Sequence, residues 1–185
     1  RPSITARWRK AMKFLLTFLL LVNVCNGQWT NLGQGLDQQG RRLLFDSTIN
    51  SLIVIGNFTY ADTLTANHIA SWNGQAWNTF GSGSPYGSPG YSITKFQNQY
   101  YFSSVFHISN PNDNWLAKWT GVIWDTISPS VNGSIVCFYE RNNELYLAGG
   151  FTRIGNTVAP HIAKFDGINF TTYPFAASWG AVCAI

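Results

Sequence analysis

A short phrase occurs three times in this chain, and its regular spacing is the feature that most limits the possible folds. The three copies are IASWNGQAWNTFG from Ile69, LAKWTGVIWDTIS from Leu116 and IAKFDGINFTTYP from Ile162. Their first aromatic residues, Trp72, Trp119 and Phe165, lie 47 and 46 residues apart. A fixed period of this length is typical of repeat proteins in which each unit packs against the next.

Other residues keep the same register. The matching positions are Gly74, Gly121 and Gly167; Trp77, Trp124 and Phe170; and, upstream, Phe58, Phe106 and Phe151. Each unit alternates apolar and polar residues as strand, turn, strand, longer loop, strand, tight turn, strand. In the first unit, the strands are expected near 42–47, 52–58, 68–73 and 75–80.

The last two strands of each unit form a predicted hairpin. Asn73-Gly74 and Asp166-Gly167 suit a two-residue type I′ turn, and Thr120-Gly121 is a weaker version. The aromatic residues on both sides of the turn are expected to brace the hairpin and fill the gap to the next unit. The fold class predicted is therefore all-β: a β-propeller of four-stranded antiparallel blades, with about three complete blades and partial ones at both ends.

The blades are expected at about 30–77, 78–124 and 125–170, with a partial blade at 171–185. A lone final strand around Trp29 matches the end of a blade, because it lies 48 residues before Trp77. A closed propeller has typically ~4–8 blades. The sequence is therefore interpreted as the N-terminal fragment of a longer protein.

The start of the chain is distinct from the repeats. Residues 14–24 are an apolar run preceded by four basic residues, which is the pattern of a secretory signal peptide. As a helix this run would reach about 16 Å, against about 30 Å for a bilayer core, so a stable membrane span is the weaker interpretation. Residues 12–27 are interpreted as the signal peptide and residues 1–11 as an upstream or n-region extension. The mature chain then covers residues 28–185, and the expected location is secreted, extracellular or cell-surface.

The basic charge of the chain lies in this leader. Five of the twelve Lys and Arg residues and none of the eight acidic residues precede Gln28, so the mature part carries 7 minus 8, or −1. Nucleic acid is therefore excluded as an expected partner. Cys137 and Cys183 lie one repeat apart and would occupy equivalent sites, which favours two small buried residues over a disulfide but leaves the bond open.

The repeat resembles a known family. The stretch LYLAGGFT followed by HIAKFDGINF looks like a kelch-type blade, and the pattern is similar to kelch-like repeats of secreted bacterial surface proteins and fungal cortical-marker proteins. The resemblance covers residues 28–185 and implies a propeller. The first unit has Gly56-Asn57 and the second Ser104-Val105 where the family prefers two glycines, so the middle blade departs from the pattern. The resemblance implies little about activity, because propellers have many roles.

Candidate chemistry is sparse. His68 and His161 occupy equivalent positions, one per blade, which suits structural hydrogen bonds better than a metal site. The oxygen-rich stretch NPNDN at 110–114 lacks the spacing of a calcium loop and is interpreted as a polar turn. The sequence contains no nucleophile elbow, zinc-protease motif or phosphate loop. No catalytic, cofactor-binding or metal-binding residue is therefore predicted, and no cofactor.

Two classes of function remain. The favoured one is a non-enzymatic secreted or surface-displayed propeller that binds an extracellular protein or glycan through its loop face, or has a structural role. The alternative is an extracellular hydrolase, lyase or oxidase whose catalytic residues come from several blades and lie partly outside residues 1–185.

The leader yields a first prediction. Expressed from Met12 in a host with a secretory pathway, the protein is expected to be exported and to begin at or near Gln28, because small Gly27 fits a cleavage site. N-terminal sequencing of the secreted product checks this. Recovery of Met12 on protein that stays in the cytoplasm would contradict it.

Overall fold

A computed structural model of the chain describes residues 31–104 and 116–173. All of these residues belong to one compact unit, Asn31–Ile185. The predicted signal peptide, the strand around Trp29, the NPNDN stretch, Phe106, Cys183 and the partial blade after residue 173 lie outside the described residues.

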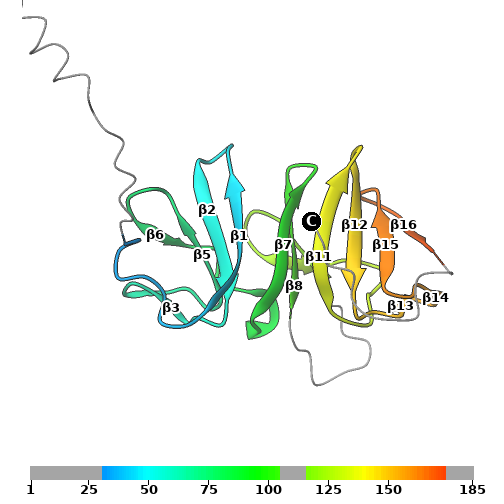
Figure 1. Ribbon diagram of the computed structural model, residues 1–185, viewed down its shortest axis with the longest axis horizontal. Helices are drawn as coiled ribbons and strands as arrows, with labels where there is room; N and C mark the ends of the chain where they lie inside the picture. Colours follow the sequence, from blue (N-terminus) through cyan, green and yellow to red (C-terminus); the bar gives the residue numbers. More distant parts are fainter. Residues whose placement is uncertain (1–30, 105–115, 174–185) are drawn as a thin grey trace, which may run out of the picture. The chain divides into compact units, whose positions relative to one another are not determined.

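The described residues form three four-stranded antiparallel sheets, which follow one another along the chain (Figure 1). The first sheet contains β1 (Gly40–Asp46), β2 (Ser51–Gly56), β5 (Ile69–Trp72) and β6 (Trp77–Thr79). The second contains β7 (Gly90–Phe96), β8 (Gln99–Ser104), β9 (Leu116–Trp119) and β10 (Trp124–Thr126). The third contains β11 (Ile135–Arg141), β12 (Glu144–Gly149), β15 (Ile162–Phe165) and β16 (Phe170–Thr172). The prediction of an all-β chain built from four-stranded antiparallel sheets is confirmed.

Three short elements connect these strands. Two small hairpins link the second and third strands of the first and third sheets, and a 3₁₀ turn precedes β7. They are β3 (Tyr60–Ala61) with β4 (Leu64–Thr65), β13 (Arg153–Ile154) with β14 (Thr157–Val158), and η1 (Pro85–Gly87).

The repeated phrase forms the last hairpin of each sheet. The two aromatic residues of each copy lie directly opposite one another, in the pairs Trp72 with Trp77, Trp119 with Trp124, and Phe165 with Phe170. The ring centroids in these pairs are 5.4, 5.1 and 4.6 Å apart. The expectation that these residues brace the hairpins is confirmed.

The turn type differs from the prediction. A type I′ turn needs positive φ at both central residues. Here Gly74 has φ 97°, Asn73 is outside the positive-φ region, and Asn73 N–H bonds to Ala76 O, so Asn73 precedes the turn. Its Oδ1 accepts hydrogen bonds from the N–H groups of Gln75 and Ala76, both at 2.9 Å. The equivalent residues Thr120 and Asp166 accept N–H bonds in the same way. The residue before the glycine therefore needs a side-chain oxygen that accepts backbone N–H groups of the turn.

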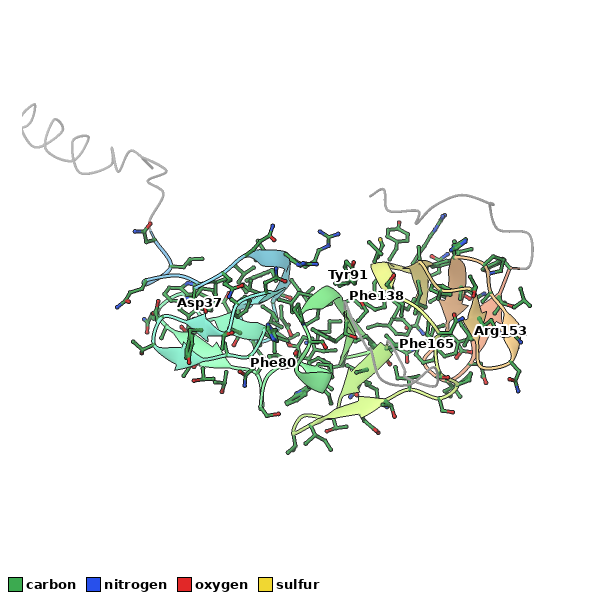
Figure 2. The ribbon with its side chains drawn as sticks, turned by 90° about the horizontal axis from the view of Figure 1, so that it is seen from below. Asp37, Phe80, Tyr91, Phe138, Arg153 and Phe165 are labelled. Atoms are coloured by element: carbon green, nitrogen blue, oxygen red, sulfur yellow. The ribbon has the colours of Figure 1, made fainter. Side chains whose placement is uncertain are left out.

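A second repeated device fixes the small hairpins. Asp37 and Asn132 are equivalent positions, one before β1 and the other before β11. In each case one side-chain oxygen accepts two consecutive backbone N–H groups. These are the N–H groups of Thr59 and Tyr60, both at 2.8 Å from Asp37 Oδ1, and of Thr152 and Arg153, at 2.9 and 2.8 Å from Asn132 Oδ1. Figure 2 labels Asp37, which precedes β1, and Arg153, the first residue of β13.

Aromatic residues fill the space between the first and second sheets. Phe80 follows β6, is 9 % exposed and contacts three rings of the second sheet (Figure 2). The centroid distances are 5.2 Å to Tyr100, 5.0 Å to Trp119 and 5.8 Å to Trp124. Ile53, Ile55 and Ile69 of the first sheet and Ile93 and Phe102 of the second complete this cluster.

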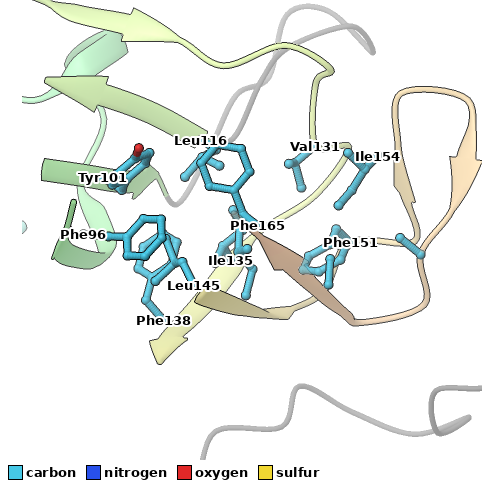
Figure 3. Packing of buried hydrophobic residues seen from close by; sticks show 13 residues of the cluster. Phe96, Tyr101, Leu116, Val131, Ile135, Phe138, Leu145, Phe151, Ile154 and Phe165 are labelled. Atoms are coloured by element: carbon cyan, nitrogen blue, oxygen red, sulfur yellow. The ribbon is translucent and has the colours of Figure 1, made fainter. Parts of the chain in front are cut away.

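A separate cluster joins the second and third sheets (Figure 3). Phe96, Tyr101 and Leu116 of the second sheet pack with Phe138, Leu145 and Phe165 of the third. The Tyr101 and Phe165 rings meet edge to face at 5.8 Å. Between them the two clusters bury apolar residues from all three sheets. The hairpin rings of the second and third sheets pack toward the preceding sheet rather than the next one, and Trp72 and Trp77 belong to a cluster within the first sheet.

The contact made by Phe80 gives a second prediction. Phe80→Ala is expected to lower the free energy of unfolding by about 3–5 kcal/mol, because it leaves a cavity against three aromatic rings. Phe45→Ala is the matched control, since Phe45 is 61 % exposed and should matter little. Urea unfolding followed by tryptophan fluorescence measures both. Equal effects of the two substitutions would show that Phe80 does not join the sheets.

Candidate functional site

The first strand of each sheet contains an irregularity at the same position. Pairing with the second strand shifts between Gly40 and Arg42, between Gly90 and Ser92, and between Ile135 and Cys137. The residue left out of register is Arg41 in β1, Tyr91 in β7 and Val136 in β11. A β-bulge of this kind turns a side chain away from the direction that strict alternation would give it.

The three bulges lie close together. Strands β1, β7 and β11 are edge strands of their own sheets, and β7 contacts both β1 and β11. A hollow of about 300 Å³ lies at the ends where these strands begin. Its lining residues are Gln39, Gly40, Arg41, Arg42, Tyr91 and Val136. All three bulge residues therefore line one hollow. Figure 2 labels one of them, Tyr91.

The charge of the hollow is positive. The Arg41 guanidinium carbon lies 5.7 Å from the centre of the Tyr91 ring, a cation–π contact. The Arg41 Nε is buried and has no hydrogen-bond acceptor within the described parts of the chain. Arg42 is exposed, and its Nη1 donates to the Arg41 carbonyl oxygen at 3.3 Å. Neither arginine forms an ion pair with a described carboxylate, because the two ion pairs there join Lys95 to Asp46 and Lys164 to Glu144.

The residue types in the hollow suit binding. Two guanidinium groups and an amide supply hydrogen-bond donors, while Tyr91 and Val136 supply apolar surface. None of the six lining residues is a common nucleophile or general base at neutral pH. Among residues 31–104 and 116–173, no three His, Cys, Asp or Glu side chains come together as metal ligands would.

The two histidines singled out from the sequence lie in equivalent turns of the first and third sheets. His68 and His161 have φ of 74° and 66°, and their N–H groups bond to the carbonyls of Phe58 and Phe151. His161 Nδ1 is 3.1 Å from the Gly149 carbonyl oxygen, so the predicted structural role is confirmed for this ring. The Nδ1 of His68 is buried without a hydrogen-bond partner in the described structure. The structure does not bring the two rings to one site.

A buried carboxylate ties the first sheet to the second. Asp46 is 3 % exposed and accepts hydrogen bonds from Lys95 Nζ at 2.7 Å, from Thr48 N–H at 2.8 Å and from the Tyr100 hydroxyl. Burial alone would raise the pKa of Asp46, but the bonds from Lys95, Tyr100 and Thr48 outweigh it and hold this pKa well below its usual value. Burial and the bond to Asp46 raise the pKa of Tyr100. Asp46 is therefore ionised and firmly held at neutral pH.

Sequence reasoning missed both the hollow at the three bulges and the Asp46 network. No pattern in the sequence distinguishes Arg41 from a residue that alternates regularly along a strand. A glycine two residues before a predicted strand, as Gly40 and Gly90 are, is the signal that could have indicated a bulge. Asp46 and Lys95 are 49 residues apart and come together only when two sheets pack.

Comparisons with known proteins do not assign the chain to a family. No protein-family model, curated protein or solved structure matches it. Within the described ranges, no helix has the length and hydropathy needed to cross a bilayer.

The Asp46 network gives a third prediction, which concerns pH. The pKa of Asp46 is lower in the folded state than the ~3.9 of an unfolded chain, so its contribution to stability is present above about pH 4 and is lost as pH falls through the folded value. Asp46→Asn is expected to cost about 2–3 kcal/mol at pH 7 and to flatten the loss of stability below pH 4.

Urea unfolding at neutral and acidic pH measures this effect. Asp125→Asn is the matched control, because Asp125 is exposed in β10 and, among the described residues, bonds only to the neighbouring Thr126 N–H. If Asp46→Asn keeps the full acid sensitivity of the parent chain, Asp46 is not the group responsible.

Proposed function

We propose that this chain is a secreted, kelch-like β-propeller protein that binds an extracellular protein or glycan rather than catalysing a reaction. Binding occurs at the end of the molecule where the first strands of the blades begin. The observation that carries the proposal is the hollow between β1, β7 and β11, which is lined by the bulge residue of each strand.

The propeller part of the proposal is supported by the repeat. Three four-stranded antiparallel sheets follow one 46–47-residue period, and each packs against the next through apolar clusters. Neighbouring first strands contact one another. This is the arrangement expected of successive blades, each of which buries its faces against its neighbours. The resemblance of LYLAGGFT to a kelch-type blade agrees with it.

The binding part is supported by the chemistry of the hollow. A volume of about 300 Å³ is at the lower end of the range for ligand sites. Donor groups and apolar surface stand side by side, and the lining contains no His, Cys, Asp, Glu or Lys side chain. Secretion is supported by the apolar run at 14–24 with its basic flank.

The fourth prediction tests the binding role. The full chain is screened for saturable binding against glycan arrays and extracellular proteins, and each ligand found is tested against Val136→Trp and Val122→Trp. Val136→Trp is expected to abolish binding, because a large ring fills the hollow. Val122→Trp adds the same ring at a turn residue that is 77 % exposed, and should leave binding unchanged.

Thermal melts of both variants distinguish loss of binding from loss of folding. Ligand binding that survives Val136→Trp in a folded protein would remove the hollow as the site. Turnover of an extracellular polymer or small molecule by the full chain would favour the enzymatic alternative.

A further inference from the structure

We propose that the hollow binds the carboxylate group of an acidic sugar, with Arg41 and Arg42 as the residues that hold it. This inference rests on the proposed binding function and names the ligand class for the same site. Three features of the hollow support it: the unpaired donor of Arg41, the charge around this residue and the types of residue that line the hollow.

Arg41 is half-buried, and one of its donor atoms is buried without a partner among the described residues. A guanidinium has five N–H donors and no acceptor, so each buried N–H needs an oxygen. The Arg41 Nε is buried without such an oxygen in the described structure. Leaving a buried donor unpaired costs free energy, and an anionic oxygen of a ligand would remove that cost.

The Arg41 side chain is also held in place. The bulge between Gly40 and Arg42 directs it out of the regular sheet, and its guanidinium stacks over the ring of Tyr91. Stacking on an aromatic ring limits the freedom of the planar guanidinium and leaves its N–H edge available. A ligand carboxylate therefore meets a donor that is already oriented.

The positive charge of the hollow is not neutralised nearby. No Asp or Glu lines the hollow. The nearest carboxylates along the chain, Asp37 and Asp46, both have other partners: Asp37 accepts two backbone N–H groups, and Asp46 is paired with Lys95. Arg41 and Arg42 are therefore available to a ligand anion.

The lining favours a sugar over a peptide. Gln39 offers an amide for hydroxyl groups, and Tyr91 and Val136 offer apolar surface for the C–H face of a ring. The planar fork of an arginine matches a carboxylate through two parallel hydrogen bonds. A uronic acid combines these three features in one residue.

The fifth prediction measures ligand preference. The full chain is titrated with a short oligosaccharide of a uronic acid and with the neutral oligosaccharide of the same sugar and length, and calorimetry measures the affinity for each. The acidic sugar is expected to bind about tenfold or more tightly than the neutral one. Its affinity should fall as salt is raised, since the contact is charge-assisted.

Variants assign this preference to the arginines. Arg41→Gln is expected to weaken binding of the acidic sugar about tenfold and to leave the neutral sugar unchanged. Arg41→Lys keeps the charge but loses the planar fork, so its affinity for the acidic sugar should lie between that of the parent chain and that of Arg41→Gln. Arg141→Gln is the matched control: it makes the same change at an exposed residue at the opposite end of β11 and should have no effect. If Arg41→Gln does not fold, Arg42→Gln at an exposed position gives the same test.

The outcomes separate this inference from the function beneath it. Binding of a neutral glycan or a protein that Val136→Trp blocks but Arg41→Gln does not would overturn the acidic-sugar site and leave the binding function standing. Binding of acidic peptides in preference to acidic sugars would overturn the sugar as ligand. Failure of every ligand class to bind would overturn both proposals.

Discussion

The structure depends on aromatic packing between neighbouring sheets. Phe80 is inserted among three rings of the second sheet, and Tyr101 meets Phe165 across the next boundary. A four-stranded sheet with two apolar faces is not stable in water by itself, so each sheet needs such contacts with its neighbour. The same packing brings β1, β7 and β11 side by side. The hollow therefore exists only because the clusters on either side of the second sheet hold the first strands together.

Much of the fold was predictable because the residues that determine it recur in every repeat. The columns containing Trp72, Trp119 and Phe165 identified the last hairpin of every sheet, but a two-residue turn would pair Trp72 with Gln75, whereas the structure pairs Trp72 with Trp77. The turn type was wrong because Asn73-Gly74 was taken as the central pair, whereas Asn73 precedes the turn and caps it.

The paired-glycine signal has a steric basis: a Cβ on Gly149 would lie 2.0 Å from the Ser134 carbonyl oxygen. Ser104 occupies the same position in the second sheet, and its buried Oγ has no partner among the described residues.

The candidate site was not predictable from the sequence, and the reason is geometric. A strand read with a strict period of two assigns Arg41 to a face of its sheet, but the bulge sends the side chain toward Tyr91 of the next sheet. Charge counting did not help, because a net charge of −1 for residues 28–185 says nothing about where two arginines lack partners. The pairing of Asp46 with Lys95 was hidden for a similar reason, since it depends on how two sheets pack.

The repeat also separates positions that the fold fixes from positions that it leaves open. Phe58 and Phe151 are equivalent, fully buried and identical, because each fills the same space beside a small hairpin. The bulge position, in contrast, is Arg41, Tyr91 and Val136 in the three sheets. The backbone requires a bulge there but no particular side chain, since the side chain leaves the sheet and enters the hollow. The side chain at such a position can change without a cost to core packing, so it can be of any type that suits a ligand. This is why a cationic, an aromatic and an aliphatic residue can meet at one place in an otherwise repetitive structure.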